Sequence, residues 1–331
     1  MMESLPFLLK PAPKDYLWGG SRLNDDFGKE IDCSPLAETW ECSTHPDGQS
    51  FVASGEYTGN QLGKVLEMHP EWLGSHPLQT TGGKPELPIL IKLIDAKEDL
   101  SVQVHPDDAY ALEHEYSLGK TEMWYVLAAK KNAKLVYGFN QRVNREQVQK
   151  ALATGQIEKY LNHVSVQKDD VFFIEAGTVH AIGAGCLIAE IQESSNITYR
   201  LYDYDRIDKN GKKRPLHFEK ALDVVKLNSS NIPRQPMRLL RYKKGNANEL
   251  LTRCKYFQVE RMLLNTEVHR NLTDFRTGNN SFHALLCIEG CGVLFGEGFM
   301  LNFFRGDCVF VPANSIPLKF HGQAQLLDVY C

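Results

Sequence analysis

The sequence predicts a mainly β protein that forms a sandwich or a barrel, and three observations support this class. Short runs rich in Val, Ile, Phe and Tyr recur along the chain, and Gly, Pro, Asn or Asp bound most of them. This spacing is typical of antiparallel strands joined by turns rather than of βαβ units. Stretches with helical periodicity are few. Two distant segments also repeat one pattern, which favours a β unit that is present twice.

The predicted strands follow one another closely along the chain. They lie at Pro88–Ile94, Thr121–Ala128, Leu135–Phe139, Val171–Ile174, Leu187–Gln192, Ile197–Tyr204, Tyr256–Leu263, His283–Ile288, Gly292–Phe295, Cys308–Val311 and Leu326–Tyr330. Helical periodicity occurs at Asp107–Tyr116, Asn144–Leu161 and Pro215–Leu227. The second of these stretches lies between predicted strands, so we expect a helical insert near residues 144–161.

The repeated pattern lies in Asp169–Ile182 and Gly306–Phe320. Each segment has an acidic residue, an apolar strand, a turn of small residues and a second strand. When Asp170 is aligned with Asp307, His180 falls opposite Pro317. Two related β-barrels, one of which lacks this histidine, would give this pattern.

The chain is long enough for two such units. Its 331 residues suggest about two domains, at roughly 100–200 residues each. Residues 228–248 are polar, contain Pro233 and Pro236, and are predicted to be an irregular link. We therefore expect a larger unit at residues 1–240 and a smaller one at residues 241–331.

Composition excludes several classes of function. The net charge is −4 and no basic stripe is present, so nucleic acid is not an expected partner. No apolar run reaches the ~18 residues of a membrane-spanning helix, and the N-terminus lacks the pattern of a signal peptide. The eight cysteines form no CxxC pair, which favours free thiols in a reducing compartment. We therefore expect the protein in the cytoplasm.

Polar side chains alternate with valines in the segment LSVQVHPDD. Successive side chains of a strand point to opposite faces, so Ser101, Gln103 and His105 share one face. Val102 and Val104 share the other face and can pack into a sheet. This is the arrangement of a site that lines a barrel.

Two further segments supply side chains of the same kind. In GKTEMWYVL, Lys120, Glu122 and Trp124 share a face by the same rule. The segment EAGTVHAIG places His180 at the start of a strand, after a glycine turn. Nitrogen and oxygen ligands without thiolates suit zinc, with manganese, iron or cobalt less favoured. The candidate ligands from three strands are Gln103, His105, Glu122 and His180.

Basic side chains in or just after strands are the other candidates for catalytic or anion-binding roles. Lys92 lies within the apolar run PILIKLI, so it is either paired, lowered in pKa by burial, or extended to solvent from the strand end. Arg200 lies in a strand, and Arg206 lies in the turn beyond it. A guanidinium group suits phosphate or carboxylate. The competing interpretation is a structural salt bridge to Asp203 or Asp205.

These segments resemble type I phosphomannose isomerases, and they occur in the same order along the chain. The matching stretches are WGG at Trp18–Gly20, LAETWECSTHPDG at Leu36–Gly48, LPILIKLIDAKEDLSVQVHPDD at Leu87–Asp108, GKTEMWYVLAA at Gly119–Ala129, DVFFIEAGTVHAIGAG at Asp170–Gly185 and AEIQESSNITYRLYDYDR at Ala189–Arg206. The resemblance implies a duplicated cupin (jelly-roll β-barrel) with a short helical insert. It places a metal-binding catalytic cupin domain at residues 1–240 and a degenerate cupin-like domain at residues 241–331.

The resemblance also implies a role for each candidate residue. By this resemblance, one zinc ion is bound by Gln103, His105, Glu122 and His180. The implied catalytic residues are Arg200, Lys92, Lys120 and Glu190, and the implied contacts to a substrate phosphate are Ser101 and Arg206. Longer members of the family read HKPE where this chain has Gly119–Lys120–Thr121–Glu122, so no histidine beside Lys120 can open the sugar ring.

The activity implied by the resemblance is reversible isomerisation of mannose 6-phosphate and fructose 6-phosphate. A proton would move between C2 and C1, taken by Glu190 or by a lysine of lowered pKa. One alternative is a different metal-dependent cupin enzyme, such as an iron oxygenase. The other is a non-catalytic sugar-phosphate sensor on the same fold. The sequence makes no prediction about the oligomeric state.

Overall fold

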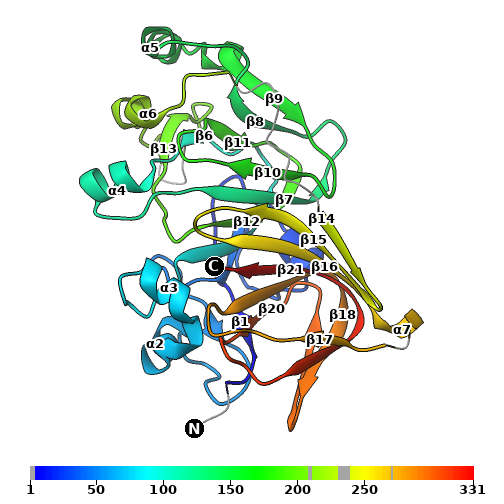
Figure 1. Ribbon diagram of the computed structural model, residues 1–331. Helices are drawn as coiled ribbons and strands as arrows, with labels where there is room; N and C mark the ends of the chain where they lie inside the picture. Colours follow the sequence, from blue (N-terminus) through cyan, green and yellow to red (C-terminus); the bar gives the residue numbers. More distant parts are fainter. Residues whose placement is uncertain (1–3, 208–210, 230–238, 270) are drawn as a thin grey trace.

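The computed structural model describes residues 4–207, 211–229, 239–269 and 271–331, and its architecture is mainly β, as predicted. Two sheets form the first barrel, and a third sheet forms most of the second (Figure 1). Within the described residues, every pairing between the named strands is antiparallel. No helix in these ranges is both long and apolar enough to cross a membrane.

The first barrel faces a six-stranded sheet against a five-stranded one. The six-stranded sheet has the order β10 (Val171–Ile174), β7 (Glu122–Ala129), β12 (Cys186–Glu193), β5 (Ile89–Ala96), β3 (Glu38–Cys42), β2 (Ala12–Lys14). The five-stranded sheet has the order β13 (Tyr199–Tyr202), β6 (Val102–Val104), β11 (His180–Ile182), β8 (Lys134–Phe139), β9 (Leu161–Ser165). The strands predicted in this half are therefore confirmed.

The third sheet combines the C-terminal strands with two N-terminal ones. Its main path has the order β14 (Leu239–Lys243), β15 (Asn246–Arg253), β16 (Gln258–Asn265), β21 (Leu318–Tyr330), β18 (His283–Gly296), β20 (Cys308–Val311), β1 (Phe7–Lys10), β4 (Phe51–Val52). Strand β17 (Thr273–Phe275) pairs with β21, and β19 (Phe299–Phe304) pairs with β18. Phe7 lies opposite Phe310, so the start of the chain is built into the C-terminal sheet.

Apolar side chains pack in layers between the sheets. Val102 and Val104 cover the outside of the five-stranded sheet and meet the helices there. Trp124 and Ile182 lie in the core between the two sheets of the first barrel. On its other face, the six-stranded sheet packs Ile91 against the C-terminal sheet. Strands β5 and β12 are therefore buried on both faces along their whole length.

Helices cover the outside of this framework. They are α1 (Arg22–Asp25), α2 (Leu62–Met68), the 3₁₀ turn η1 (Pro70–Leu73), α3 (Ser75–Thr80), α4 (Asp108–Glu115), α5 (Arg145–Ala153), the 3₁₀ turn η2 (Ile157–Tyr160), α6 (Phe218–Val224) and α7 (Thr266–His269). The predicted helical insert is confirmed but shorter, because α5 ends before Gly155, which has a φ of +65°. Asn144 and Gln147 form a capping box at the start of α5.

The predicted irregular link is wrong for part of its length. Residues 230–238 lie outside the described residues, but Leu239–Lys243 and Asn246–Arg253 form strands β14 and β15. All five residues of β14 are exposed, including Leu239, Leu240 and Tyr242, because β14 lies at the edge of its sheet. The predicted boundary at residues 240 and 241 lies inside β14, and the domain division stays a prediction.

The two segments of the internal repeat share the same hydrogen bond at their aspartate. Asp170 accepts a hydrogen bond from the backbone N–H of Gln167 at 2.9 Å, and Asp307 accepts one from Phe304 at 2.8 Å. Each aspartate precedes a four-residue strand, β10 or β20. His180 begins β11, whereas Pro317 directly precedes β21. The two copies therefore share one backbone design, and the histidine is present in the first copy.

Candidate active site and metal centre

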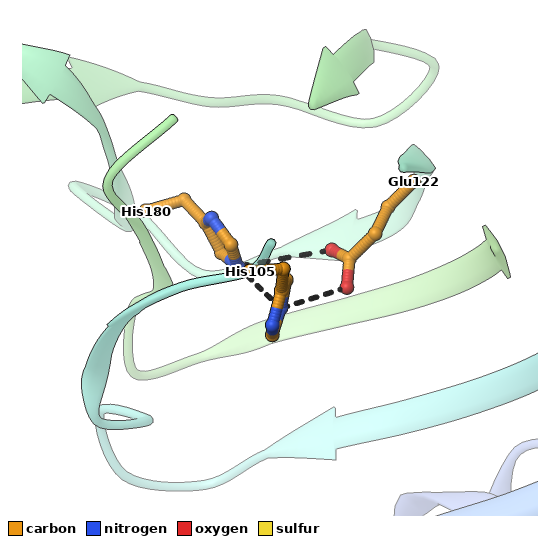
Figure 2. Close-up of side chains that lie close together, drawn as sticks. All are labelled: His105, Glu122 and His180. Carbon is orange, nitrogen blue, oxygen red and sulfur yellow. Dashed lines mark hydrogen bonds and ion pairs between the residues drawn. The ribbon is translucent and has the colours of Figure 1, made fainter. Parts of the chain in front are cut away.

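Three of the four predicted ligands meet at one point inside the first barrel. Nε2 of His105 lies 3.1 Å from Oε1 of Glu122 and 3.1 Å from Nε2 of His180. Nε2 of His180 lies 3.8 Å from Oε2 of Glu122. Figure 2 shows the three side chains converging, and all three are buried.

The strands fix the positions of these side chains. His105 follows β6, Glu122 begins β7 and His180 begins β11. The Nδ1 atom of His180 lies 2.8 Å from the backbone carbonyl of Thr178. A carbonyl can only accept, so this nitrogen carries the proton and the Nε2 lone pair faces the cluster.

The cluster fits a zinc ion by chemistry and by spacing. Zinc–ligand bonds of about 2.0–2.1 Å place tetrahedral ligand atoms about 3.3 Å apart. The separations of 3.1 and 3.8 Å lie around this value. Burial, with the charge of Lys120, lowers the pKa of His105 to about 3, and burial also lowers the pKa of His180. Both imidazoles are therefore neutral, which is the form that binds a metal.

The fourth predicted ligand, Gln103, lies directly beside His180 on the neighbouring strand. Gln103 of β6 pairs with His180 on one side and with Arg200 of β13 on the other. Directly paired residues point to the same face of a sheet, so these three side chains face the barrel interior. Gln103 also lines the cavity beside the cluster.

Lys120 is attached to the same cluster. Its Nζ lies 2.9 Å from Oε1 of Glu122 and 3.3 Å from Nε2 of His105. The side chain is 5% exposed. Gly119 occupies the position before it, and an added Cβ there would lie 2.6 Å from the backbone of Asp107. A larger residue, such as the histidine of the longer family members, would therefore require the backbone to move.

Two carboxyl groups hold the segment that carries Lys120. Asp108 accepts a hydrogen bond from the backbone N–H of Gly119 at 3.2 Å, and Glu193 accepts one from Thr121 at 2.6 Å. Burial, with the neighbouring Asp108, raises the pKa of Glu193 to about 8. Glu193 is therefore protonated at neutral pH and can donate a hydrogen bond to Asp108.

Trp124 connects the ligand cluster to a second buried carboxyl group. Its indole N–H donates to Oε2 of Glu122 at 3.0 Å and to Oε2 of Glu190 at 2.8 Å. Burial and the negative charge of Glu122 raise the pKa of Glu190. A carboxyl group of raised pKa beside a metal site is suited to acid–base catalysis.

Lys92 forms ion pairs with Glu190 and with Glu38, which is not one of the predicted site residues. Its Nζ lies 3.3 Å from Oε1 of Glu190 and 3.7 Å from Oε2 of Glu38. Burial disfavours the charged amine, but these two carboxylates outweigh it and raise the pKa of Lys92. Lys92 is therefore a paired cation, and the alternatives of a lowered pKa and of exposure to solvent are wrong for it.

The three remaining predicted residues make no hydrogen bond or ion pair with His105, Glu122 or His180 within the described residues. Arg200 carries a buried Nε that makes no hydrogen bond within the described residues, and burial and the charge of Arg214 lower its pKa. Arg206 forms the competing salt bridge, 2.7 Å from Asp203. Ser101 is buried, at 4% exposure. Neither Ser101 nor Arg206 lines the cavity that contains Lys92, Gln103, Lys120 and Glu190.

The cavity also contains polar residues outside the predicted set. They are Tyr16, Glu38, Asn196, Thr198 and Arg214. Glu38 shares a strand face with Trp40 and accepts a hydrogen bond from its indole N–H at 2.7 Å. Alternation in LAETWEC puts Glu38 on the same face as Trp40, but only the pairing of β3 with β5, which sets Trp40 opposite Lys92, brings Glu38 to the lysine.

Comparisons with known proteins show the family of this chain. Residues 7–147 match the family model "Phosphomannose isomerase type I, catalytic domain", and residues 246–331 match "Mannose-6-phosphate isomerase, cupin domain". The chain is 36% identical over 327 residues to the mannose-6-phosphate isomerase ManA of Bacillus subtilis, covering 98% of this chain and 99% of that protein. It is 36% identical over 330 residues to the putative mannose-6-phosphate isomerase YvyI of the same organism, again covering 98% and 99%.

Solved structures show the same fold. The crystal structure of mannose 6-phosphate isomerase from Bacillus subtilis superposes with a TM-score of 0.88 at 34% identity, covering 98% of this chain and 99% of that one. A zinc-bound mannose 6-phosphate isomerase superposes with a TM-score of 0.77 at 17% identity, covering 98% and 99%. The resemblance noted in the sequence is confirmed, and the chain belongs to the type I phosphomannose isomerase family.

Proposed function

We propose that this protein interconverts mannose 6-phosphate and fructose 6-phosphate. The observation that carries the proposal is the bridge from Glu122 through the Trp124 indole to Glu190. It holds a carboxyl group of raised pKa beside a cluster suited to a metal ion. Moving a proton between C2 and C1 of a sugar requires both features, because a base must take the proton while positive charge stabilises the oxygens.

We propose zinc as the ion, held by His105, Glu122, His180 and Gln103. Zinc in a characterised relative, the neutral imidazoles and the ligand spacing support this choice. When bound, the ion supplies a positive charge that polarises a substrate oxygen. Lys120 is held against Glu122 and His105, where it adds a second positive charge at the oxygens of the substrate.

Glu190 is the proposed base. Its raised pKa allows it to take the C2 proton and to return it to C1 at neutral pH. Lys92 cannot take this role because its amine stays charged between Glu190 and Glu38. It keeps Glu190 in place instead.

Arg200 is the proposed stabiliser of the developing negative charge. Its buried Nε makes no hydrogen bond within the described chain, so the group has a donor to offer to a substrate oxygen. The family resemblance assigns Ser101 and Arg206 to the substrate phosphate, and this assignment stays a prediction. Holding a remote phosphate would orient the reacting carbons.

We propose that the protein acts in the cytoplasm. All eight cysteines are free, which supports a reducing compartment. The proposed partner is a small sugar phosphate, with no nucleic acid or membrane involved. The proposed units remain a catalytic cupin at residues 1–240 and a second cupin at residues 241–331.

A coupled assay of mannose 6-phosphate conversion tests the proposed function. We expect the zinc-loaded protein to convert mannose 6-phosphate. A protein with either rival function would not convert it. An oxygenase would instead contain iron and consume oxygen. A sensor would bind mannose 6-phosphate tightly without converting it, and that result would replace the isomerase proposal.

A further inference from the structure

The cavity beside the ligand cluster has an arginine that the family resemblance does not assign. Arg214 lines this cavity together with Asn196 and Thr198. The same cavity contains Lys92, Glu190, Gln103 and Lys120. Arg214 therefore shares a space with the proposed reaction centre.

Arg206, the arginine assigned to phosphate, is occupied by protein groups. Its Nη1 donates to the backbone carbonyl of Asp99, and its Nε donates to the carbonyl of Asp203. Its Nη2 donates to Oδ1 of Asp203 at 2.7 Å. Each of its three nitrogens is already engaged, and Arg206 is not among the residues of the cavity.

The guanidinium group of Arg214 is held in place through two of its three nitrogens. Its Nε donates to Oδ2 of Asp203 at 2.7 Å, and its Nη2 donates to Oδ1 of the same carboxylate. This two-point contact fixes the plane of the guanidinium group. Nη1 makes no hydrogen bond among the residues that the structure describes, so it is available to a ligand in the cavity.

The positive charges around Asp203 outnumber its single negative charge. Its one carboxylate, 5% exposed, bonds both Arg206 and Arg214. Arg200 lies close enough to Arg214 for the two positive charges to oppose each other. Three guanidinium groups and one carboxylate leave an excess of positive charge in a partly buried space, which an anionic ligand would neutralise.

We infer that Arg214, with the hydroxyl of Thr198, binds the phosphate of the sugar phosphate, in place of the Arg206 contact that the resemblance implies. The inference rests on the proposed function for the identity of the substrate. Arg206 is then a positioning residue, which holds Asp203 and through it Arg214.

The test compares Arg214→Gln with Arg206→Gln, and uses Arg142→Gln as a matched control at an exposed arginine just before α5. Two quantities are measured: KM and kcat for mannose 6-phosphate, and the affinity for inorganic phosphate by calorimetry. We expect Arg214→Gln to raise KM and the phosphate Kd by about 10- to 100-fold, the usual effect of losing charge-assisted hydrogen bonds. The change in kcat should be far smaller, because the phosphate is remote from the reacting carbons.

A larger rise of KM and phosphate Kd in Arg206→Gln than in Arg214→Gln would overturn the inference. Wild-type values in a folded Arg214→Gln would do the same. If Arg214→Gln fails to fold, Arg214→Lys decides, since lysine keeps the charge but loses the two-point geometry. It should raise KM several-fold, and an unchanged KM would refute the inference.

The outcome separates this inference from the proposed function. Phosphate binding that depends on Arg214, without any turnover by the wild-type protein, would support the phosphate site and reject the isomerase. Turnover that is indifferent to Arg214 would support the isomerase and reject the site.

Discussion

Lys92 and Glu190 face each other on paired strands, with 3.3 Å between Nζ and Oε1. Both side chains are almost completely buried. The lysine stays charged because Glu38 lies on its other side. The same register places Trp124 opposite Glu190 on the next strand, so the proposed base is held by a cation on one side and by an indole on the other.

Glu190→Gln should lower kcat by about 10²- to 10⁴-fold, the usual contribution of a general base. The amide keeps the shape of the side chain but cannot take a proton. Zinc content should stay unchanged, since Glu190 is not a proposed ligand. Steady-state kinetics and metal analysis check this, with the exposed Glu146→Gln of α5 as the control. A zinc-loaded Glu190→Gln enzyme with wild-type kcat would mean that another group moves the proton.

Arg200→Ala should lower kcat by about 10²- to 10³-fold, as expected for loss of a donor to developing negative charge. The ligand cluster should keep its zinc because Arg200 contacts none of its three buried side chains among the described interactions. Kinetics on protein of measured zinc content check this, with Ala in place of the exposed Arg142 as the control. A folded, zinc-loaded variant of near-normal kcat would remove Arg200 from the mechanism.

Glu193→Gln should flatten the pH dependence of stability. The pKa of Glu193 is about 8 in the folded protein and near 4.5 when unfolded, so the folded state holds a proton that the unfolded chain has released. The free energy of unfolding therefore falls as pH rises between these values, by up to about 1.4 kcal/mol per pH unit from this group. Glutamine cannot titrate, so this contribution disappears.

Urea unfolding of the wild type, of Glu193→Gln and of the control Glu146→Gln at pH 5.5 and pH 7.5 measures this difference. The loss of stability between the two pH values should be smaller in Glu193→Gln than in the wild type and in Glu146→Gln. Equal losses in all three proteins would show that Glu193 is ionised in the folded state at neutral pH.

A chain truncated after residue 245 should not fold as a soluble unit. Strand β1 pairs with β20, and Phe7 stacks on Phe310 at 5.2 Å. The six-stranded sheet also buries Ile91 and Met123 against the C-terminal sheet. Truncation would expose this apolar face, and expression followed by gel filtration checks the result. A soluble, active fragment would show that the second cupin is dispensable.

Strand alternation was enough to predict most of the ligand cluster. Gln103 lies in β6 and His105 directly follows this strand, two residues further on, while Glu122 and His180 each begin a strand. The face that they share points into the barrel, which is the position predicted for them. A lysine inside PILIKLI stands out in the sequence, but its pairing with Glu38 depends on β3 lying beside β5, which no local pattern reveals.

Contacts between distant segments could not be predicted from local patterns. Helices α2 and α3 are short, and the segment between Leu73 and His76 is fixed by backbone hydrogen bonds to residues 279–282. Arg214 lies outside the strands, where side-chain alternation gives no information. Strand β14 is not predicted because the stretch that precedes it is polar and contains Pro233 and Pro236, which favours an irregular link.

The central claim is an aldose–ketose isomerase that depends on one zinc ion in the His105–Glu122–His180 cluster. The most direct measurement is the rate of mannose 6-phosphate conversion as zinc is removed by chelation and added back in known amounts. The rate should fall to the background on chelation, and it should recover in proportion to bound zinc up to one ion per chain. A rate that is unaffected by complete removal of metal would contradict the claim.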